Sequence, residues 1–388
     1  MNILNYNKFL IISHTRASGP TQEIRDYFIK YKVTFAFLEH PFSFNKRERN
    51  SRITYFRRGR KIKSIEGIKI NGPDLLWYLK DIFYTLYFII KGSEKYNYCI
   101  AADNLNAFSA WLLKKIGFVN KVIYWTIDYS PRRFENKLLN YIYHLIDRFC
   151  CYNSDLLWVS SPRMKDARQK KGYNIERCAE ELVVRDGCHF ERIERLADKE
   201  VNKFKLVFMG LLSERKGVDL LIKALPELLK DYPRVTLTII GTGPEEEKLQ
   251  NLVLELGIKN KVFFTGFIKE HYILEKTIAS CGIAFAPYNP DPYNYTFFSD
   301  VMKVKTYLAC GLPVLITKVP EIAEEIQSRK AGLIIKYDKR DLVQKTKQLL
   351  VDKETFLNCR FQAIKFAKEL SWDRVFRDAM KETVQILK

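Results

Sequence analysis

The chain has 388 residues, of which 47% are hydrophobic and 14% aromatic. This length predicts two or three domains, and the composition is apolar enough to exclude an intrinsically disordered protein. The apolar run Ile82–Ile90 is far shorter than the ~20 residues that cross a bilayer, and Met1–Leu10 lacks the features of a secretory signal. We therefore expect a cytoplasmic protein, which binds a membrane, if at all, on the inner face.

The formal net charge of +20 is concentrated near the N-terminus. Residues 1–70 hold 15 Lys and Arg against 5 Asp and Glu, and the segment 45–63 is the densest part. Such a segment attracts the phosphates of nucleic acid, anionic lipid or a charged substrate. A solvated face on an ordinary basic protein explains it equally well.

The eight cysteines show no pattern of a metal site or of a disulfide framework. No two of them have Cys-x-x-Cys spacing, and none is spaced from a histidine as metal ligands are. We expect buried thiols in a reducing compartment and no bound metal.

In chain order, the first half begins with an apolar strand, Phe9–Ser13, that ends in a turn around Gly19. The elements predicted after it are helix Thr21–Tyr31, strand Val33–Leu38, helix Leu75–Lys91, strands Tyr98–Ala102 and Val122–Thr126, helix Asn136–Cys151 and strand Leu157–Ser160. Strands that alternate with helices are typical of an α/β domain. We expect this domain over residues 1–195.

From Lys205 onward the alternation of apolar strands and amphipathic helices is strict. The predicted strands are Lys205–Met209, Val235–Ile240, Val262–Thr265, Ile283–Pro287, Pro313–Thr317 and Gly332–Lys336. This pattern predicts a doubly wound parallel sheet in a second domain, 204–370, followed by a helix in 371–388 that we expect to pack back on the first domain. The predicted fold class is α/β, with two Rossmann-like, doubly wound parallel-sheet domains.

Ligands of a parallel sheet bind beyond the carboxyl ends of the strands, where helix N-termini expose backbone N–H groups. Three turns of the second half lie at such places. They are residues 210–217, which include Lys216, residues 241–244, and the pair Ser299–Asp300 ahead of Lys303. Each turn alone is common in proteins, but three at the ends of consecutive strands predict a shared phosphate-binding crevice.

The second half resembles the nucleotide-sugar-binding half of a GT-B glycosyltransferase of the group 1 (GT4-like) family. The segments that carry the resemblance are FMGLLSERKGVDLLIKALPELL, LTIIGTGPEEEKLQNLVLELGIKNKVFFTGFI, SDVMKVKTYLACGLPVLITKVPEIAEEI, AGLII and SWDRV. The first half is similar to the acceptor-binding half in general plan. The resemblance implies two domains that face a cleft, and transfer of a sugar from a nucleoside diphosphate sugar to a glycan or lipid-linked acceptor. It also implies retention of configuration and no metal or other cofactor.

The resemblance also assigns residues to the donor. Lys216 matches the phosphate-contacting lysine of the family, and it is a predicted catalytic residue together with Asp300 and Asp128. The predicted donor-binding residues are Gly19, Gly210, Lys216, Gly241, Gly243, Phe267, Ser299, Asp300 and Lys303. The chain departs from the family at three positions, because Leu211 replaces an arginine, and Phe298 and Thr306 replace the two glutamates of the E-x7-E signature. Asp300 and Lys303 are the substitute pair.

In the first half, polar residues that follow predicted strands are candidates for the acceptor. The predicted acceptor-binding residues are His14, Asp103, Asn104 and Arg132, the last with Arg133 beside it. Asp128 also follows a strand, at a place where such enzymes commonly touch the donor sugar. A helix cap or a solvated loop residue is an equally good interpretation of each.

Two further interpretations remain open. The aromatic run from Trp77 to Phe88 is more typical of a core, but with the basic segment beside it, it also suits an anionic membrane surface. A nucleotide-sugar epimerase is a second enzymatic candidate, which the lysine motifs favour less. A nucleic-acid-binding protein is the non-enzymatic candidate, although residues 1–70 contain no base-reading module, so we expect no specific nucleic acid partner.

Overall fold

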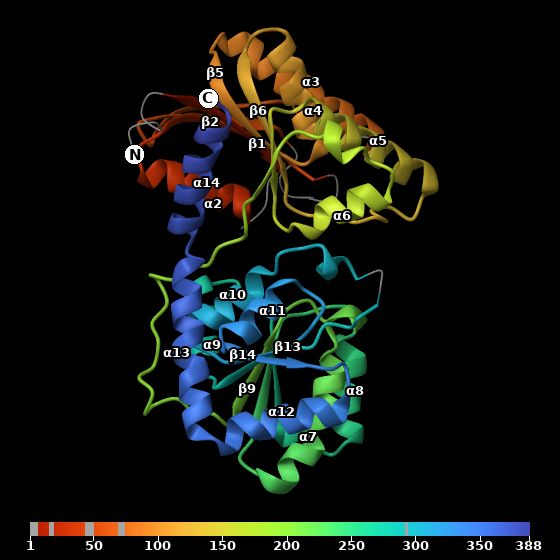
Figure 1. Ribbon diagram of the computed structural model, residues 1–388, viewed down its shortest axis with the longest axis vertical. Helices are drawn as coiled ribbons and strands as arrows, with labels where there is room; N and C mark the ends of the chain where they lie inside the picture. The colour runs from red at the N-terminus through yellow and green to blue at the C-terminus, as the bar shows by residue number, and fades with distance from the viewer. Residues whose placement is uncertain (1–6, 15–18, 43–49, 69–73, 292–293) are drawn as a thin grey trace. The chain divides into compact units, whose positions relative to one another are not determined.

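The computed structural model describes residues 7–14, 19–42, 50–68, 74–291 and 294–388. The chain forms two compact units (Figure 1). Unit 1 comprises Met1–Arg185 and Val375–Lys388, and unit 2 comprises Asp186–Arg374. The chain thus leaves unit 1 after Arg185, and the last helix carries it back there. Among the helices that the structure describes, none is both long and apolar enough to span a bilayer.

Unit 1 is built on an eight-stranded sheet with the order β4-β3-β2-β1-β5-β6-β7-β8. Its strands are β1 (Lys8–His14), β2 (Thr34–His40), β3 (Arg52–Arg57), β4 (Arg60–Glu66), β5 (Tyr96–Ala102), β6 (Val119–Thr126), β7 (Leu156–Val159) and β8 (Glu181–Val183). From β2 through β1 to β8 all neighbours are parallel. The central strands are almost wholly buried, as in a sheet covered on both faces.

The hairpin β3–β4 adds two antiparallel strands to one edge of the parallel sheet, and the sequence analysis did not predict it. β2 pairs antiparallel with β3, and β3 with β4. The tight turn between the hairpin strands holds Arg58 at φ 49° and Gly59 at φ 73°, the positive values that a two-residue type I′ turn requires. Residues 45–49 of the basic segment lie outside the described residues, and residues 52–63 supply the hairpin.

Helices cover both faces of the sheet of unit 1 (Figure 1). They are α2 (Pro20–Lys30), α3 (Asp74–Gly92), α4 (Asn104–Lys115), α5 (Lys137–Asn153), α6 (Arg163–Lys170) and the larger part of α14 (Trp372–Ile386). On one face α4 packs between α3 and α5. On the other face Phe376 of α14 lies 5.6 Å from the Tyr27 ring of α2, and Trp158 of β7 donates a 2.9 Å hydrogen bond to Thr383.

Unit 2 has a six-stranded, fully parallel sheet with the order β11-β10-β9-β12-β13-β14. Its strands are β9 (Lys205–Met209), β10 (Thr236–Ile240), β11 (Val262–Gly266), β12 (Ile283–Ala286), β13 (Val314–Thr317) and β14 (Gly332–Ile335). Its helices are α7 (Val218–Asp231), α8 (Glu246–Glu255), α9 (His271–Ala279), α10 (Met302–Ala309), α11 (Ile322–Ser328), α12 (Lys339–Val351) and α13 (Lys353–Glu369). All six strands predicted for this half are present.

Each sheet has a topological switch point, where neighbouring strands continue in opposite directions across the sheet. In unit 1 it lies between β1 and β5, and in unit 2 between β9 and β12. Helices leave the sheet on opposite faces at such a point, and a crevice opens there beyond the carboxyl ends of the strands. The residues that directly follow these four strands are therefore the first places to look for ligand-binding groups.

Candidate active site

In unit 2 the two glycine turns interlock at the carboxyl end of β9. The amide of Gly210, directly after β9, donates a 2.8 Å hydrogen bond to Ile240, and Leu212 donates a 2.9 Å bond to Thr242. Gly241 has φ +129°, and a Cβ there would lie 2.0 Å from the carbonyl oxygen of Gly210. A Cβ on Gly243 would lie 2.3 Å from the carbonyl oxygen of Leu212. Glycine is therefore what allows the two turns to meet.

Lys303 of α10 brings an ammonium group to the same turns. Its Nζ atom lies 2.6 Å from the position that a Cβ on Gly210 would take. Burial lowers the pKa of Lys303 to about 8, because the charged form loses hydration there. Within the described part of the chain, this ammonium has neither an ion pair nor a hydrogen bond. A desolvated cation beside the two glycine turns favours an anionic ligand.

Lys216 ties the first turn to the loop that precedes α10. It is buried, and its Nζ donates a 3.1 Å hydrogen bond to Thr296 Oγ1. The same ammonium lies 4.9 Å from the ring centre of Tyr288 and 4.8 Å from that of Tyr295, within the range of a cation–π interaction. Asn294 adds a 3.1 Å hydrogen bond to the Arg215 carbonyl. The first and third predicted turns therefore lie against each other.

Ser299 and Asp300 hold the start of α10 in place. Ser299 Oγ donates a 3.1 Å hydrogen bond to the Tyr295 carbonyl. Asp300 forms an ion pair with Lys305, and both side chains are buried. The Asp186 amide donates a 2.7 Å hydrogen bond to the same carboxylate oxygen. These contacts position the loop, and the catalytic role of Asp300 stays a prediction.

Phe267 lies at the rim of this group. It directly follows Gly266, whose carbonyl oxygen accepts a 2.9 Å hydrogen bond from Gly241. Its ring is 75% exposed, so its face is open to stack on a planar ligand group. The turns at 210–217, 241–244 and 299–303 thus meet at one edge of the sheet of unit 2.

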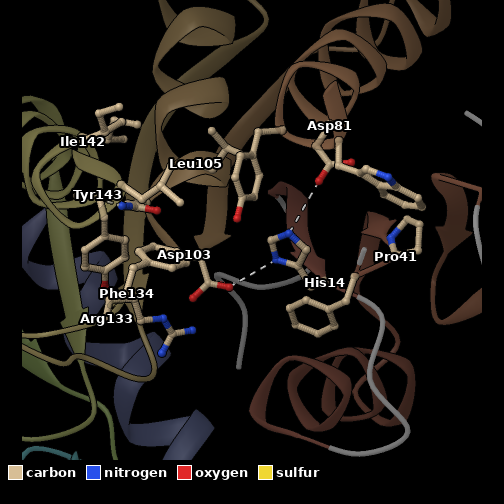
Figure 2. Close-up of a pocket in the computed structure, with 15 residues that line it drawn as sticks. His14, Pro41, Asp81, Asp103, Leu105, Arg133, Phe134, Ile142 and Tyr143 are labelled. Atoms are coloured by element: carbon tan, nitrogen blue, oxygen red, sulfur yellow. Dashed lines mark hydrogen bonds and ion pairs between the residues drawn. The ribbon is translucent and has the colours of Figure 1, made fainter. Parts of the chain in front are cut away.

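Unit 1 has a cavity of about 420 Å³ beyond the carboxyl ends of β1 and β5 (Figure 2). Its lining comes from β1, the loop after β2, α3, α4, residues 133–134 and α5. Phe42, Trp77, Tyr78, Phe134 and Tyr143 give it aromatic walls. It therefore has the concave, mainly apolar character of a small-molecule site, with a few polar groups inside.

His14 is the centre of these polar groups, and Figure 2 shows Asp81 and Asp103 on two sides of its ring. Nδ1 lies 3.2 Å from Asp103 Oδ2, and Nε2 lies 3.7 Å from Asp81 Oδ2. Burial alone would lower the pKa of His14, but hydrogen bonds and charge from Asp103 and Asp81 raise it to about 9. His14 is therefore an imidazolium at neutral pH, stacked on Phe42 at 4.8 Å between ring centres.

A second histidine lies behind the first. His40 is fully buried, with Nδ1 2.9 Å from Ser51 Oγ and Nε2 2.9 Å from Thr85 Oγ1. Burial lowers the pKa of His40 to about 4. Lys80 lies 3.1 Å from Asp81. Burial would raise the pKa of the Asp81 carboxyl, but its interactions with His40, His14 and Lys80 lower it. Asp81 is therefore an ionised carboxylate beneath the pocket.

Asp103 has an unusual backbone conformation. It lies between β5 and α4 at φ 71° and ψ 156°, a region that almost only glycine adopts. An aspartate here ordinarily caps the helix with its side chain. In the part of the chain that the structure describes, Asp103 makes no such capping bond, and its carboxylate is paired with His14 instead.

The other residues predicted for the first half lie in different surroundings. Asn104 donates a 3.0 Å hydrogen bond to the Tyr143 carbonyl and so ties α4 to α5. Of the two adjacent arginines, Arg133 lines the pocket and Arg132 is exposed beside it. Asp128 is half-buried in the loop after β6, and Gly19 is the N-cap of α2. The roles predicted for all of them remain predictions.

Asp81 is a charged residue of the pocket lining that the sequence analysis did not predict. The available signal was a charged pair, Lys80–Asp81, in an otherwise apolar helix. Charged residues are rarely buried unless they are paired, so such a pair inside a helix indicates a buried polar cluster. Which strand end faces this cluster is not readable from the sequence.

Comparisons with known proteins bear on both units. Residues 190–366 match the family described as glycosyl transferases group 1. An uncharacterised glycosyltransferase of Methanocaldococcus jannaschii is 27% identical over 188 residues, which is 47% of this chain and 44% of the relative. The D-inositol 3-phosphate glycosyltransferase of Corynebacterium jeikeium is 26% identical over 240 residues, 57% of this chain and 55% of the relative. The chain thus aligns with about half the length of these curated relatives.

Solved structures extend the likeness to the whole chain. HepE of Anabaena in complex with UDP has a TM-score of 0.71 at 16% identity and covers 97% of this chain and 100% of its own. The sucrose-phosphate synthase of Thermosynechococcus elongatus has a TM-score of 0.73 at 14% identity, covering 98% and 99%. The two α/β units are those of the GT-B class, which confirms the predicted fold class. The match to group 1 glycosyl transferases, residues 190–366, falls within unit 2.

Proposed function

We propose that the protein is a glycosyltransferase that transfers a sugar from a nucleoside diphosphate sugar, whose diphosphate binds at the interlocked turns of unit 2. The observation that carries the proposal is the desolvated ammonium of Lys303 against Gly210, which has no partner among the residues that the structure describes. As the bond between sugar and diphosphate breaks, negative charge grows on the leaving phosphate. Preorganised cations and backbone N–H groups lower the barrier by stabilising that charge.

The relatives support this class of donor. Several are named as GDP-mannose-dependent mannosyltransferases, and several structural neighbours are complexes with UDP. Lys216, held beside Thr296, is a second cation at the same edge of the sheet. Retention of configuration and independence from metal ions rest on the sequence resemblance. Both are tested by the anomeric configuration of the product and by activity in the presence of a chelator.

A panel of nucleotides tests the donor site. We expect one of UDP, GDP and ADP, or one of their sugars, to raise the melting temperature, since a ligand at 100 times its Kd adds ~2.7 kcal/mol of stability. Lys303→Met removes the ammonium and is expected to abolish most of this shift. Lys230→Met, an exposed lysine at the end of α7, is the matched control. The proposal fails if no nucleotide stabilises the protein. Recovery of an isomerised nucleotide sugar, with no transfer, would instead identify an epimerase.

We further propose that the acceptor binds in the His14 pocket of unit 1. The pocket lies at the switch point of its sheet and combines aromatic walls with buried carboxylates. Of the residues predicted for the acceptor, His14, Asp103 and Asn104 line it.

We also propose that unit 1 rests on anionic membrane and takes a lipid-linked acceptor there. The helices α3 and α5 expose Leu79, Phe83, Leu138 and Tyr141, each more than half exposed. The basic hairpin lies beside α3, because the amide of Ile68 donates a 2.7 Å hydrogen bond to the Tyr84 hydroxyl. Apolar side chains next to basic ones are typical of surfaces that bind anionic lipid.

Flotation with anionic vesicles at low and high salt tests the membrane proposal. We expect binding at low salt that weakens at high salt, because exposed charges are screened. The double variant Arg60→Glu/Lys61→Glu is expected to lose binding, and Lys339→Glu/Arg340→Glu on α12 is the control with the same change of charge. The absence of wild-type binding at low salt would refute this proposal and leave the donor site untouched.

A further inference from the structure

The His14 pocket combines two kinds of wall that together suit one class of ligand. Trp77 and Tyr78 of α3, with Phe42 after β2, provide aromatic surface, while Asp103 and His14 provide charged hydrogen-bonding groups. A sugar ring has C–H faces that pack on aromatic rings and hydroxyls that donate to carboxylates. A purely apolar ligand would leave these charges desolvated, which is costly.

The backbone of Asp103 is a second, independent observation. A residue other than glycine at φ 71° and ψ 156° is strained, and such strain is concentrated at ligand-binding and active sites. Here the strain accompanies a carboxylate that leaves the helix N-terminus and points to the pocket beside His14 (Figure 2). A cap alone does not need this conformation, since capping residues ordinarily adopt extended angles.

Asp81 lies deeper in the pocket than Asp103, and its carboxylate is less accessible to a ligand. Its side chain is 4% exposed, against 29% for Asp103. The His14 ring lies between the two carboxylates, 3.7 Å from the inner one and 3.2 Å from the outer one. An imidazolium held on both nitrogens fixes the orientation of the outer carboxylate. A carboxylate has about four acceptor positions, and that of Asp103 is 29% exposed, so a ligand hydroxyl in the cavity can reach it.

We infer that this pocket binds a sugar ring of the acceptor, that Asp103 accepts a hydrogen bond from one of its hydroxyls, and that Asp81 is a positioning residue that acts through His14. The inference rests on the proposed glycosyltransferase function and names the chemical class of its acceptor. It assigns Asp81 a role in positioning His14, and it explains the strained backbone of Asp103 by the placement of its carboxylate in the pocket.

Histidine NMR on the full chain reports on the pocket directly. The chain has only five histidines, and a His14→Gln variant assigns the His14 signal. The probes are the n-octyl glycosides of glucose, galactose, mannose and N-acetylglucosamine, each below its micelle concentration. We expect at least one of them to shift the His14 signal saturably while His271, on α9 of unit 2, stays unchanged. The inference is overturned if none of the four moves the His14 signal.

Substitution of Asp103 tests its contact with the sugar. Asp103→Asn keeps the shape of the side chain but removes its charge, and we expect at least a tenfold loss of glycoside affinity. Asp155→Asn is the matched control, because Asp155 pairs with Lys114 at 2.7 Å before β7, at the opposite edge of the sheet. Equal glycoside affinity in Asp103→Asn and the wild type would contradict the inference.

The test of Asp81 needs a measurement that a purely structural role would leave unchanged, which is the pH dependence of glycoside binding. Glycoside affinity should be lost as pH rises through the pKa of His14. We expect Asp81→Asn to lower this pKa and to move the loss of affinity to lower pH by the same amount. Asp81→Glu should restore part of both changes. An unchanged pH dependence in folded Asp81→Asn would remove Asp81 from the mechanism. If that variant does not fold, His14→Gln breaks the same link and must weaken glycoside binding. Nucleotide-induced stabilisation of the same samples reports on unit 2, so failure of the inference and failure of the proposed function are distinguishable.

Discussion

The ammonium of Lys303 occupies the space that a side chain on Gly210 would fill, 2.6 Å from the position of the missing Cβ. Lys303 therefore supplies the charge at the carboxyl end of β9, and Gly210, which has no side chain, leaves the space for it. Neither position has this property alone, since a larger residue at 210 would displace the cation. The pKa of Lys303, lowered to about 8 by burial, makes the pair sensitive to pH near neutrality.

We expect nucleoside diphosphate affinity to fall as pH rises above about 8. Lys303 then loses the proton that attracts the phosphates, and each pH unit beyond the pKa costs at most about tenfold in affinity. Isothermal titration with the nucleotide that binds, from pH 6.5 to 9.5, measures the slope. Lys303→Arg keeps its charge over this range and should flatten the slope. A slope that persists unchanged in Lys303→Met would assign the effect to another group.

The buried Asp300–Lys305 pair predicts a large non-additive effect on stability. Lys305→Met leaves a buried carboxylate without its partner, which destabilises a protein by about 3–5 kcal/mol. The double variant Asp300→Asn/Lys305→Met removes both charges and should be less destabilised than the single Lys305→Met. Urea unfolding of the full chain measures the free energy of unfolding for each variant. Additive losses would show that the two charges are not coupled.

The two histidines of unit 1 predict opposite pH effects on stability. The pKa of His14 is raised to about 9, so its stabilising contribution is complete below the unfolded value of 6.5 and is lost as pH rises through 9. The pKa of His40 is lowered to about 4. Between pH 6.5 and 4 the unfolded state therefore binds the extra proton, and stability falls as pH falls. We expect these two contributions to give greatest stability near pH 6.5.

Variants that lack one histidine separate the two arms. His14→Gln should reduce the decline in stability between pH 6.5 and 9 and leave the decline below pH 6.5 unchanged. His40→Gln should do the reverse. Thermal unfolding across pH 4 to 9.5 measures both, and a wild-type profile in either variant would contradict the assignment.

The strain at Asp103 predicts an unusual order of two variants. Asp103→Ala and Asp103→Gly both remove the carboxylate, but only glycine adopts φ 71° and ψ 156° without strain. We therefore expect the glycine variant to be more stable than the alanine variant by about 1–2 kcal/mol, within the ~1–3 kcal/mol that such strain costs. Urea unfolding measures the difference. The opposite order, which is the rule for ordinary helix positions, would argue against strain.

The elements of unit 2 could be predicted well because each depends on local patterns. Short apolar runs followed by glycine mark buried parallel strands, and Lys205–Met209 is predicted and observed with the same bounds. In unit 1 the hairpin β3–β4 was missed, since its basic residues conceal the strand pattern. The Arg58–Gly59 turn was the available signal.

The chemistry of the site was only partly readable from the chain. Glycine turns and a lysine in the first turn of a helix have local signatures, so the sequence predicts Gly210, Gly241 and Lys303 as donor-binding residues. The partnership of His14 with Asp81 and Asp103 joins residues from three distant segments, and no local pattern encodes which strand ends meet. The same holds for Asp300. Its carboxylate pairs with Lys305 and accepts a hydrogen bond from the Asp186 amide, and residue 186 is more than 100 positions away in the sequence. Local sequence therefore decides where strands and turns form, while packing decides which charges share a buried space, because burial and neighbouring charge arise only once the sheets have assembled.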